Sequence, residues 1–405
     1  MSSEDDSSLN LFNDLLDCLE QEKAEVVPKR NVEQELKSLM DYIGGFEYWP
    51  QLNDDCKTEI ARFLDPKSLL KLGVCSKSDY SMVKKIPISV NSMSILDDNW
   101  DHYMYQSEHF DHYTVTIEFS KDQKLEIVFS QMENDTLVRW LKYIPKKRAE
   151  VKQSIIENGK YEEEAVKFAE KWMERCQYKL KYFTNGLTNY PIEKSSIKSF
   201  PNCIGIHLSA NNLEKFNWWL EKVPEKMENV SLSACSEDTV ILTEQFLNNV
   251  QVMNATKRVG LRGRAGFSDE QFVNLKARDI NFEPVNITED GVNQFLKKWV
   301  NGTGIEKLKE VLLWTDKDWD QEKVTKDLAI RPWDEDFVNE SRGFSDDFQR
   351  VCGRGEHFQI SSLIDPFESI TLTFHGDRLS IYKTGTRMIE KSGKVFTNYR
   401  IPSGV

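Results

Sequence analysis

The chain has 405 residues, of which 39% are hydrophobic and 29% are charged, and its net charge is −13. This length suffices for roughly two to three domains, and the hydrophobic content excludes a wholly disordered chain. The negative charge argues against nucleic acid as a partner, because binding a phosphate backbone requires a surplus of lysine and arginine. No apolar run approaches the ~20 residues that span a bilayer, and the acidic start lacks a secretory leader. We therefore expect a protein of the cytoplasm, the nucleus or both, with no membrane partner.

The cysteines and histidines do not form a recognisable metal or disulfide pattern. The seven cysteines are scattered and no Cys-x-x-Cys pair occurs, which argues against a disulfide scaffold or a zinc ribbon. His102, His109 and His112 lie close together in the sequence, but no second pair of ligands accompanies them. Surface or core histidines are the favoured interpretation, and no metal or other cofactor is expected.

Residues 1–48 are predicted to precede the folded part of the chain. Residues 1–8 consist of serine and acidic residues after the initial methionine, and we expect them to be disordered. The apolar residues Leu9, Phe12, Leu16 and Leu19 fall on one face of a short helix. This helix either packs back on its own chain or frays, or else serves as a docking helix for a partner. Residues 20–48 have the charged, weakly patterned composition of a linker.

The segment from Trp49 to Ile86 predicts three short helices. The first helix starts at Asn53 or Asp54 and runs to Leu64, where the Asp-Pro pair at 65–66 breaks it. The second helix starts at Pro66 and stops near Gly73, and the third is capped by Ser76. Because three short helices enclose only a small core, we expect this unit to need a partner. Its surplus of lysine and arginine favours an acidic protein partner.

This segment resembles an F-box, for which we take residues 49–86. The matching positions are Trp49-Pro50, Glu59-Ile60 with Phe63-Leu64, Asp65-Pro66, Leu69-Leu70-x-Leu72, Val74-Cys75-Ser76-Lys77 and Tyr80. Trp49 stands where leucine is usual and Tyr80 where tryptophan is common, and both keep a bulky apolar group. The resemblance implies docking on a Skp-type adaptor and, through it, on the cullin of an SCF-type ubiquitin ligase. The residues expected to be buried in that interface are Pro50, Ile60, Leu64, Leu69, Leu72 and Val74.

Residues 87–199 are predicted to form a β-hairpin followed by a helical connector. The runs 113–119 and 125–129 are rich in β-branched and aromatic residues and are separated by a short polar stretch, which is typical of adjacent strands. Residues 136–183 are predicted to be helical, most clearly between Tyr161 and Tyr182.

Residues 200–325 alternate between short strands and helices. Five predicted strands recur at intervals of 21 to 31 residues. They are 204–208, 230–234, 258–261, 279–282 and 311–314. Each of the first four is followed by a helix with an apolar face. Intervals of this size bracket those of leucine-rich repeats, in which stacked strand–helix units bury a continuous core. A leucine-rich-repeat-like solenoid is favoured over an ordinary α/β domain, because the crossovers are short and the glycine-rich turn of nucleotide-binding folds is missing.

The same region resembles the F-box-associated domains of nematode F-box families. The resemblance lies in Asn293-x-Phe295-Leu296-x-x-Trp299-Val300-x-Gly302, followed by Ile305-x-x-Leu308. Residues 326–405 are predicted to cap the solenoid, with a hairpin formed by 370–374 and 379–382 and a tail beyond Lys394.

The fold class expected is α/β, or α+β overall, and the function expected is not catalytic. The sequence contains none of the local motifs of a serine nucleophile, a metalloprotease, a kinase or a ligase with its own chemistry. We interpret the chain as the substrate-recognition adaptor of an SCF-type ubiquitin ligase, whose solenoid binds an unidentified protein target. The alternative is a repeat-type interaction scaffold with no ubiquitin link, in which helices 49–86 only cap the solenoid.

Overall fold

The computed structural model describes residues 49–97 and 112–401, apart from 74, 122, 145–146, 235–241, 306, 342 and 354. The predicted N-terminal helix, His102 and His109 lie outside these residues. The chain divides into two compact units. The first comprises Met1–Lys181 with Ser195–Lys198, and the second comprises Tyr182–Lys194 with Ser199–Val405. Helices and strands are present in both units, which confirms the mixed fold class.

The first unit begins with the three predicted helices. A 3-10 turn, η2 (Trp49–Gln51), precedes α3 (Asp54–Ala61), α4 (Pro66–Gly73) and α5 (Lys77–Val83). These bounds follow from local chemistry. Asn53 caps α3, Pro66 is the first residue of α4, and the side chain of Ser76 caps α5.

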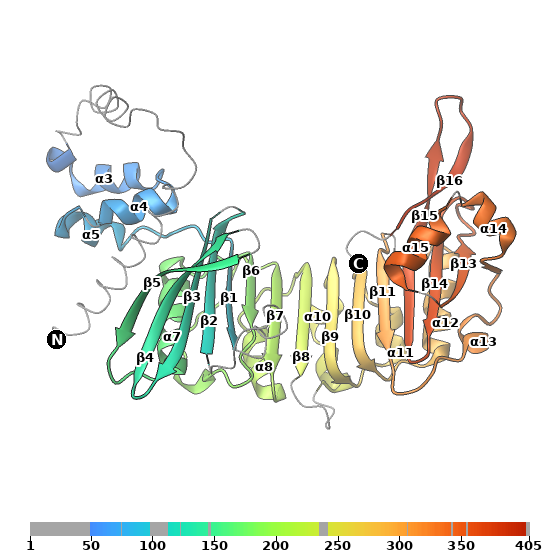
Figure 1. Ribbon diagram of the computed structural model, residues 1–405, viewed down its shortest axis with the longest axis horizontal. Helices are drawn as coiled ribbons and strands as arrows, with labels where there is room; N and C mark the ends of the chain where they lie inside the picture. Colours follow the sequence, from blue (N-terminus) through green and yellow to red (C-terminus); the bar gives the residue numbers. More distant parts are fainter. Residues whose placement is uncertain are drawn as a thin grey trace. The chain divides into compact units, whose positions relative to one another are not determined.

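An antiparallel meander follows in the same unit (Figure 1). Its strands pair in chain order: β1 (Ser92–Asp97), β2 (His112–Ser120), β3 (Gln123–Met132), β4 (Asp135–Ile144) and β5 (Lys147–Ile156). Helix α7 (Tyr161–Arg175) packs on this sheet through its apolar stripe, and the ring of its Trp172 lies 5.7 Å from that of Phe119 on β2.

The predicted helix over 136–183 is wrong before residue 161. Residues 135–156 instead form β4 and β5, joined to β3 by a turn in which Glu133 takes a left-handed conformation. Thr136, Val138 and Trp140 are buried while the residues between them are half-buried, which is the two-residue period of a strand. Pairing with β3 places every second side chain of β4 in the interior, and this outweighs the helical tendency of the segment.

The second unit contains the predicted parallel strands and one more. Strands β6 (Tyr182–Asn185), β7 (Gly205–Ala210), β8 (Asn229–Ala234), β9 (Arg258–Ala265), β10 (Asp279–Val285) and β11 (Glu310–Trp314) pair in parallel, each with the next. The short 3-10 turn η3 (Ile192–Lys194) lies between β6 and β7. The helices of this part are α8 (Leu213–Leu220), α9 (Glu244–Leu247), α10 (Val250–Met253), α11 (Asp269–Val273), α12 (Glu289–Val300) and α13 (Gln321–Val324).

The core of the second unit lies between the parallel strands and these helices. The buried strand positions share one face and are in register, such as Val230, Val259 and Ile280 on β8, β9 and β10. Aromatic rings continue the core from one repeat to the next. The ring of Phe272 on α11 stacks on that of Phe295 on α12, with 4.7 Å between their centroids. Stacking therefore buries what a single strand–helix repeat would leave exposed.

The C-terminal part closes the sheet at β11. Its elements are β12 (Ile330–Pro332), α14 (Glu335–Glu340), α15 (Phe344–Cys352), β13 (Glu356–Ser361), β14 (Ser369–His375), β15 (Arg378–Ile389) and β16 (Val395–Tyr399). The predicted hairpin is β14–β15, and β15 pairs antiparallel with β11, so that the last parallel strand is not an open edge. The predicted tail beyond Lys394 is wrong, because β16 pairs with β15.

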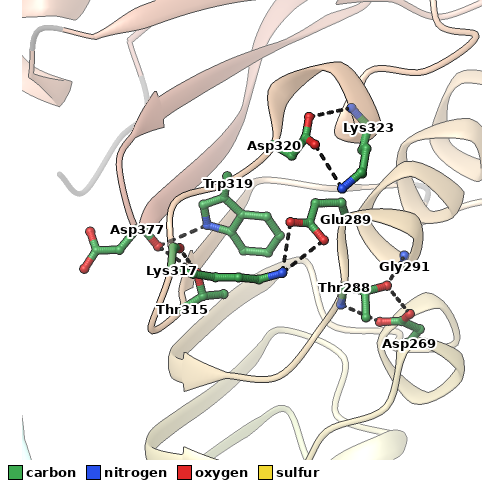
Figure 2. A network of polar contacts seen from close by, with 10 residues as sticks. All are labelled: Asp269, Thr288, Glu289, Gly291, Thr315, Lys317, Trp319, Asp320, Lys323 and Asp377. Atoms are coloured by element: carbon green, nitrogen blue, oxygen red, sulfur yellow. Dashed lines mark hydrogen bonds and ion pairs between the residues drawn. The ribbon is translucent and has the colours of Figure 1, made fainter.

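A polar network ties the loops that follow β9, β10 and β11 (Figure 2). Asp269 accepts hydrogen bonds from the backbone nitrogen and the hydroxyl of Thr288, at 2.8 and 2.5 Å. The Nζ of Lys317 donates to Glu289 at 3.1 Å. Burial alone would raise the pKa of Glu289, but hydrogen bonds from its own backbone and from Lys317 outweigh burial and lower it. The network therefore fixes the amino-terminal ends of neighbouring helices.

Gly291 provides a test of this packing. A Cβ atom at position 291 would lie 2.2 Å from Oδ1 of Asp269. Replacing a helical glycine by alanine ordinarily stabilises a helix by about 1 kcal/mol. Here we expect Gly291→Ala to destabilise the protein by about 1–3 kcal/mol, because the site is overpacked. Urea unfolding measures the change.

Two companion variants show whether the clash is the cause. Asp290→Ala, at the exposed neighbouring position, is expected to change stability by less than about 0.5 kcal/mol. In a background with Asp269→Gly, which also removes the Cβ atom that would lie 2.8 Å from a Cβ at position 291, Gly291→Ala is expected to lose most of its cost. A stabilising effect of Gly291→Ala alone would contradict the close packing.

Candidate functional site

The three helices of residues 49–86 are held together by a buried polar contact. The indole nitrogen of Trp49 donates to Oδ1 of Asp79 at 2.9 Å, and the hydroxyl of Ser76 donates to Oδ2 of the same carboxylate at 2.6 Å. Asp79 is only 6% exposed, so these bonds satisfy a carboxylate that would otherwise be costly to bury. The ammonium group of Lys57 lies 5.9 Å from the centre of the Trp49 ring. Trp49, the departure from the family pattern, thus joins the start of the segment to α5.

The turn between α3 and α4 is also well defined. Asp65 accepts from the backbone nitrogen of Ser68 at 3.1 Å and from its hydroxyl at 2.5 Å, which caps the first turn of α4. Before it, the backbone nitrogens of Phe63 and Leu64 donate to the carbonyls of Ile60 and Ala61, both at 3.1 Å. This geometry turns the chain and places the side chains of Phe63 and Leu64 outside the helical core.

The apolar side chains of this segment fall into two groups. The interior holds those of α3, α4, α5 and the residues just beyond: Ala61, Leu69, Leu70, Met82, Val83 and Ile86. In contrast, Phe63 is 89% exposed, and Ile60 and Leu64 are each 37% exposed. Single exposed apolar residues are ordinary, but here three of them lie within five positions of the chain. We call Pro50, Ile60, Phe63 and Leu64 the docking face.

The six residues predicted to be buried by an adaptor are not equivalent in the structure. Pro50, Ile60 and Leu64 are exposed, and Leu72 is half-buried. Leu69 is 3% exposed and belongs to the interior of the three helices, so its side chain supports the fold of this segment. Val74 lies outside the described residues. The sequence-based prediction omitted Phe63, although this residue stands between Ile60 and Leu64 in the same pattern.

The basic residues of this segment are partly engaged. The Arg62 guanidinium pairs with Glu59 at 2.5 Å, and Lys57 is 8% exposed. Lys77, Lys84 and Lys85 are exposed on and beyond α5. The cations available to an acidic partner therefore lie on the α5 side of the segment.

Arg175, the last residue of α7, links these helices to the meander of the first unit. Its guanidinium donates to the backbone carbonyls of Val83 and Lys84, and its own carbonyl accepts from the nitrogen of Ile88 at 3.3 Å. Burial lowers the pKa of Arg175 to about 10, which leaves the side chain charged at neutral pH. The three helices are thus fastened to α7 and are not a freely hinged module at this end.

The potential metal ligands of the described residues are dispersed. No cluster of three or more histidine, cysteine or acidic side chains there could hold a metal ion. Burial raises the pKa values of the Cys176, Cys203 and Cys352 thiols to about 11, so these cysteines carry no thiolate at neutral pH. In the same residues, no helix has both the length and the apolar composition needed to cross a membrane.

The second unit has a strand face that the helices α8–α13 leave open (Figure 1). A row of small and polar residues in register crosses it, formed by His207, Ser231, Gly260 and Asn281. Two exposed arginines, Arg258 and Arg262, stand on either side of Gly260 along β9. A surface of this kind can bind an extended polypeptide by hydrogen bonds and charge.

Comparisons with known proteins identify the domain to which these helices belong. A model of the F-box domain matches residues 49–91. An uncharacterised F-box protein of Caenorhabditis elegans is 37% identical over 386 residues, which cover 94% of this chain and 98% of the relative. No solved structure matches the chain. These matches define an F-box-bearing protein.

The chain belongs to the nematode F-box protein family. An F-box implies, in general, a role as a substrate adaptor of an SCF-type ubiquitin ligase, and such receptors are typically not catalytic. The predicted family is therefore confirmed, with an F-box that reaches five residues beyond the predicted end.

Substitution of Arg175 tests whether this residue attaches the F-box to α7. Arg175→Met keeps much of the side chain's volume but removes two charge-assisted hydrogen bonds. We expect amide exchange over residues 83–90 to rise about tenfold or more, because such bonds are worth about 1.5–3 kcal/mol each. Lys171→Met, at an exposed position of the same helix, is the matched control. Equal exchange in the two variants would mean that Arg175 does not fasten the F-box.

The lowered pKa values of two histidines lead us to expect that the folded protein loses stability in acid. The pKa of His207 is lowered to about 4 by burial and then by Arg258 and Arg262, and that of His357 is lowered to about 4 by burial and then by His375. In the unfolded chain both pKa values return to about 6.5, so the unfolded state binds protons more readily. The stability that the two neutral histidines contribute to the folded state is therefore complete above about pH 6.5, and it is lost as the pH falls towards 4.

Unfolding by urea at pH 7.5 and pH 5 measures this contribution. We expect His207→Asn combined with His357→Asn to reduce the stability difference between the two pH values by roughly 1–2 kcal/mol per histidine. A double variant that loses as much stability in acid as the parent would contradict the assignment.

Proposed function

We propose that this protein is the substrate receptor of an SCF-type ubiquitin ligase, acting in the cytoplasm, the nucleus or both. Its F-box docks on a Skp-type adaptor, and through that adaptor on a cullin. Its second unit holds a protein target close to the ubiquitin carrier. The observation that supports the proposal most strongly is the docking face, with Phe63 89% exposed beside Ile60 and Leu64.

The energetics favour docking through this face. Complete burial of a large apolar side chain is worth roughly 1.5–3 kcal/mol, and most of the Phe63 side chain is still available for burial. The partly exposed Ile60 and Leu64 add a smaller share each. The helix-capping bonds of Asp65 hold the backbone of this turn, so that little backbone entropy is lost on binding.

The target is proposed to bind the open strand face of the second unit. The exposed side chains of Arg258 and Arg262 supply charge on this face, and the half-buried Ser231 supplies a hydroxyl. The receptor role then requires no chemistry from this chain. Tethering raises the concentration of the target near a ubiquitin carrier bound elsewhere in the ligase.

The adaptor contact can be tested by two substitutions on the docking face. Phe63→Asp with Leu64→Asp puts two charges where an apolar contact forms, and we expect affinity for a purified Skp-type adaptor to fall at least about 100-fold. Because Phe63 is 89% exposed and Leu64 is partly exposed, the circular dichroism should be retained and the unfolding midpoint should change only modestly. Leu69 is unsuitable for this test, since a charge in the F-box interior would unfold it.

A matched control comes from the second unit. Leu363→Asp with Ile364→Asp makes the same chemical change at two exposed aliphatic positions, each 72% exposed. This variant is expected to bind the adaptor like the parent protein. Undiminished adaptor binding by the folded Phe63→Asp, Leu64→Asp variant would overturn the proposed docking.

A further inference from the structure

The edge at which the parallel strands of the second unit begin is rich in cations. Residues 254–258, 274–278 and 301–309, which lead into β9, β10 and β11, contain six cations and a single acid, Glu306, although the whole chain carries −13. The opposite edge has the reverse composition, because residues 266–269, 286–290 and 315–320 contain six acids and one lysine. The six cations are Lys257, Arg258, Lys276, Arg278, Lys307 and Lys309.

Three of these cations and Lys383 on β15 stand in one row. The backbone nitrogen of Arg278 donates to the carbonyl of Lys257 at 3.1 Å, and that of Lys309 donates to the carbonyl of Arg278 at 2.8 Å. The nitrogen of Lys383 donates to the carbonyl of Lys309 at 2.9 Å. Neighbouring strands lie roughly 4.8 Å apart, so the four residues fall within roughly 15 Å. We call Lys257, Arg278, Lys309 and Lys383 the basic row.

The basic row lies on the side of the sheet that carries the helices. Val259, Ile280 and Val311 each follow a member of the row by two positions and are fully buried in the core between strands and helices. Because side chains alternate along an extended chain, the row shares that side. The ammonium group of Lys383 lies 5.0 Å from the ring centre of Trp299 on α12, which agrees with this placement. The row is therefore separate from the open strand face.

Carboxylates of the chain itself occupy both ends of the basic row. At one end, the Nζ of Lys257 pairs with Glu228 at 2.6 Å. At the other end, the Nζ of Lys383 pairs with Glu368 at 2.8 Å. Lysine–carboxylate pairing is thus the contact that this row already makes where a carboxylate is within reach.

The two central cations of the row, Arg278 and Lys309, have no such carboxylate. Lys309 is exposed and Arg278 is half-buried, and neither side chain makes an ion pair or hydrogen bond with the residues that the structure describes. Glu310 follows Lys309 but belongs to the other side of the strand and is 8% exposed. Like charges on neighbouring strands repel each other, so these two cations are held next to each other at a cost in stability.

We propose that an acidic segment of another protein binds the basic row and places its carboxylates on Arg278 and Lys309. Such a segment neutralises the two central cations as Glu228 and Glu368 neutralise the ends. The contact does not depend on the receptor role. Within that role, it favours targets that carry an acidic segment beside the part bound elsewhere on the second unit.

The acidic edge of a second copy is a poorer occupant than a separate acidic segment. The acids of that edge already have partners in their own chain. Glu289 pairs with Lys317 at 3.1 Å, and Asp320 pairs with Lys323 at 3.0 Å. Docking of one copy on another would have to exchange these pairs, whereas a free acidic segment has none to lose.

Nucleic acid is also a poorer occupant. The three basic stretches, residues 254–258, 274–278 and 301–309, contain no aromatic residue on which a base could stack. Trp299, beside Lys383, is only 8% exposed. The net charge of −13 repels a long polyanion more strongly than a short acidic segment.

Fluorescence anisotropy with a labelled octaglutamate peptide tests the contact on the full-length protein. We expect binding at roughly 50 mM salt that weakens as the salt concentration rises, because screening weakens charge pairs at a surface. An octaglutamine peptide has the same length without the charges and is expected not to bind. Equal affinity for the two peptides, or no binding of octaglutamate at low salt, would overturn the proposal.

Paired charge variants show whether the basic row is the binding surface. Arg278→Gln with Lys309→Gln is expected to weaken octaglutamate binding at least about fivefold, while the unfolding midpoint stays the same or rises because repulsion within the row is relieved. Lys391→Gln with Lys394→Gln removes the same charge at the exposed turn of the β15–β16 hairpin and is expected to bind like the parent. Equal loss of affinity in the two variants would contradict a defined surface.

Carbodiimide crosslinking locates the peptide on the unmodified protein. The reagent joins a peptide carboxylate to a lysine amine, and we expect adducts at Lys309 and its neighbour Lys307. Adducts confined to the F-box or to the hairpin turn would overturn the proposal. Tighter binding of octathymidylate, or of phosphatidylserine vesicles, at the same salt concentration would also overturn it. Adaptor binding, measured on the same variants, separates failure of this contact from failure of the proposed receptor function.

Discussion

Three helices of seven or eight residues enclose too small an interior to accommodate every apolar side chain that they carry. In this F-box the interior is filled by Leu69, Leu70 and Val83 among others, and the Trp49–Asp79 hydrogen bond closes it. Ile60, Phe63 and Leu64 remain outside, at the point where Asp65 and Pro66 end one helix and begin the next. The same local chemistry that stops α3 therefore leaves exposed the apolar side chains on which the proposed adaptor contact depends.

In the second unit, by contrast, the apolar side chains become buried when repeats stack on one another. Each of its strand–helix repeats has an apolar face that it cannot bury alone, and stacking in register buries those faces completely. The antiparallel pairing of β15 with β11 then removes the open edge at one end of the parallel strands. The helices α8–α13 leave uncovered the strand face that carries the row of small and polar residues. Under the proposed function, the exposed apolar side chains of the F-box bind the adaptor and the strand face of the second unit binds the target.

Much of this organisation could be predicted from the sequence, because local signals coincided with tertiary structure. The Asn53 and Ser76 caps and the Pro66 start gave the bounds of the F-box helices, and short apolar runs between turns identified β7 to β11. Strands β4 and β5 were mistaken for helix, because their alternation became decisive only through pairing with β3. Strand β16 was mistaken for a tail, since a five-residue edge strand depends on its pairing with β15. Which F-box leucines are buried could not be read from spacing, and Leu69 proved to be interior while Phe63 proved to be exposed.

Hydrogen–deuterium exchange of the full-length protein, with and without a purified Skp-type adaptor, tests the central claim most directly. The account predicts that adaptor binding slows exchange in the peptides spanning residues 50–72, most strongly at the turn that carries Phe63 and Leu64, and leaves the parallel strands of the second unit unchanged. Identical exchange over those F-box residues at a saturating adaptor concentration, or protection confined to the second unit, would contradict it.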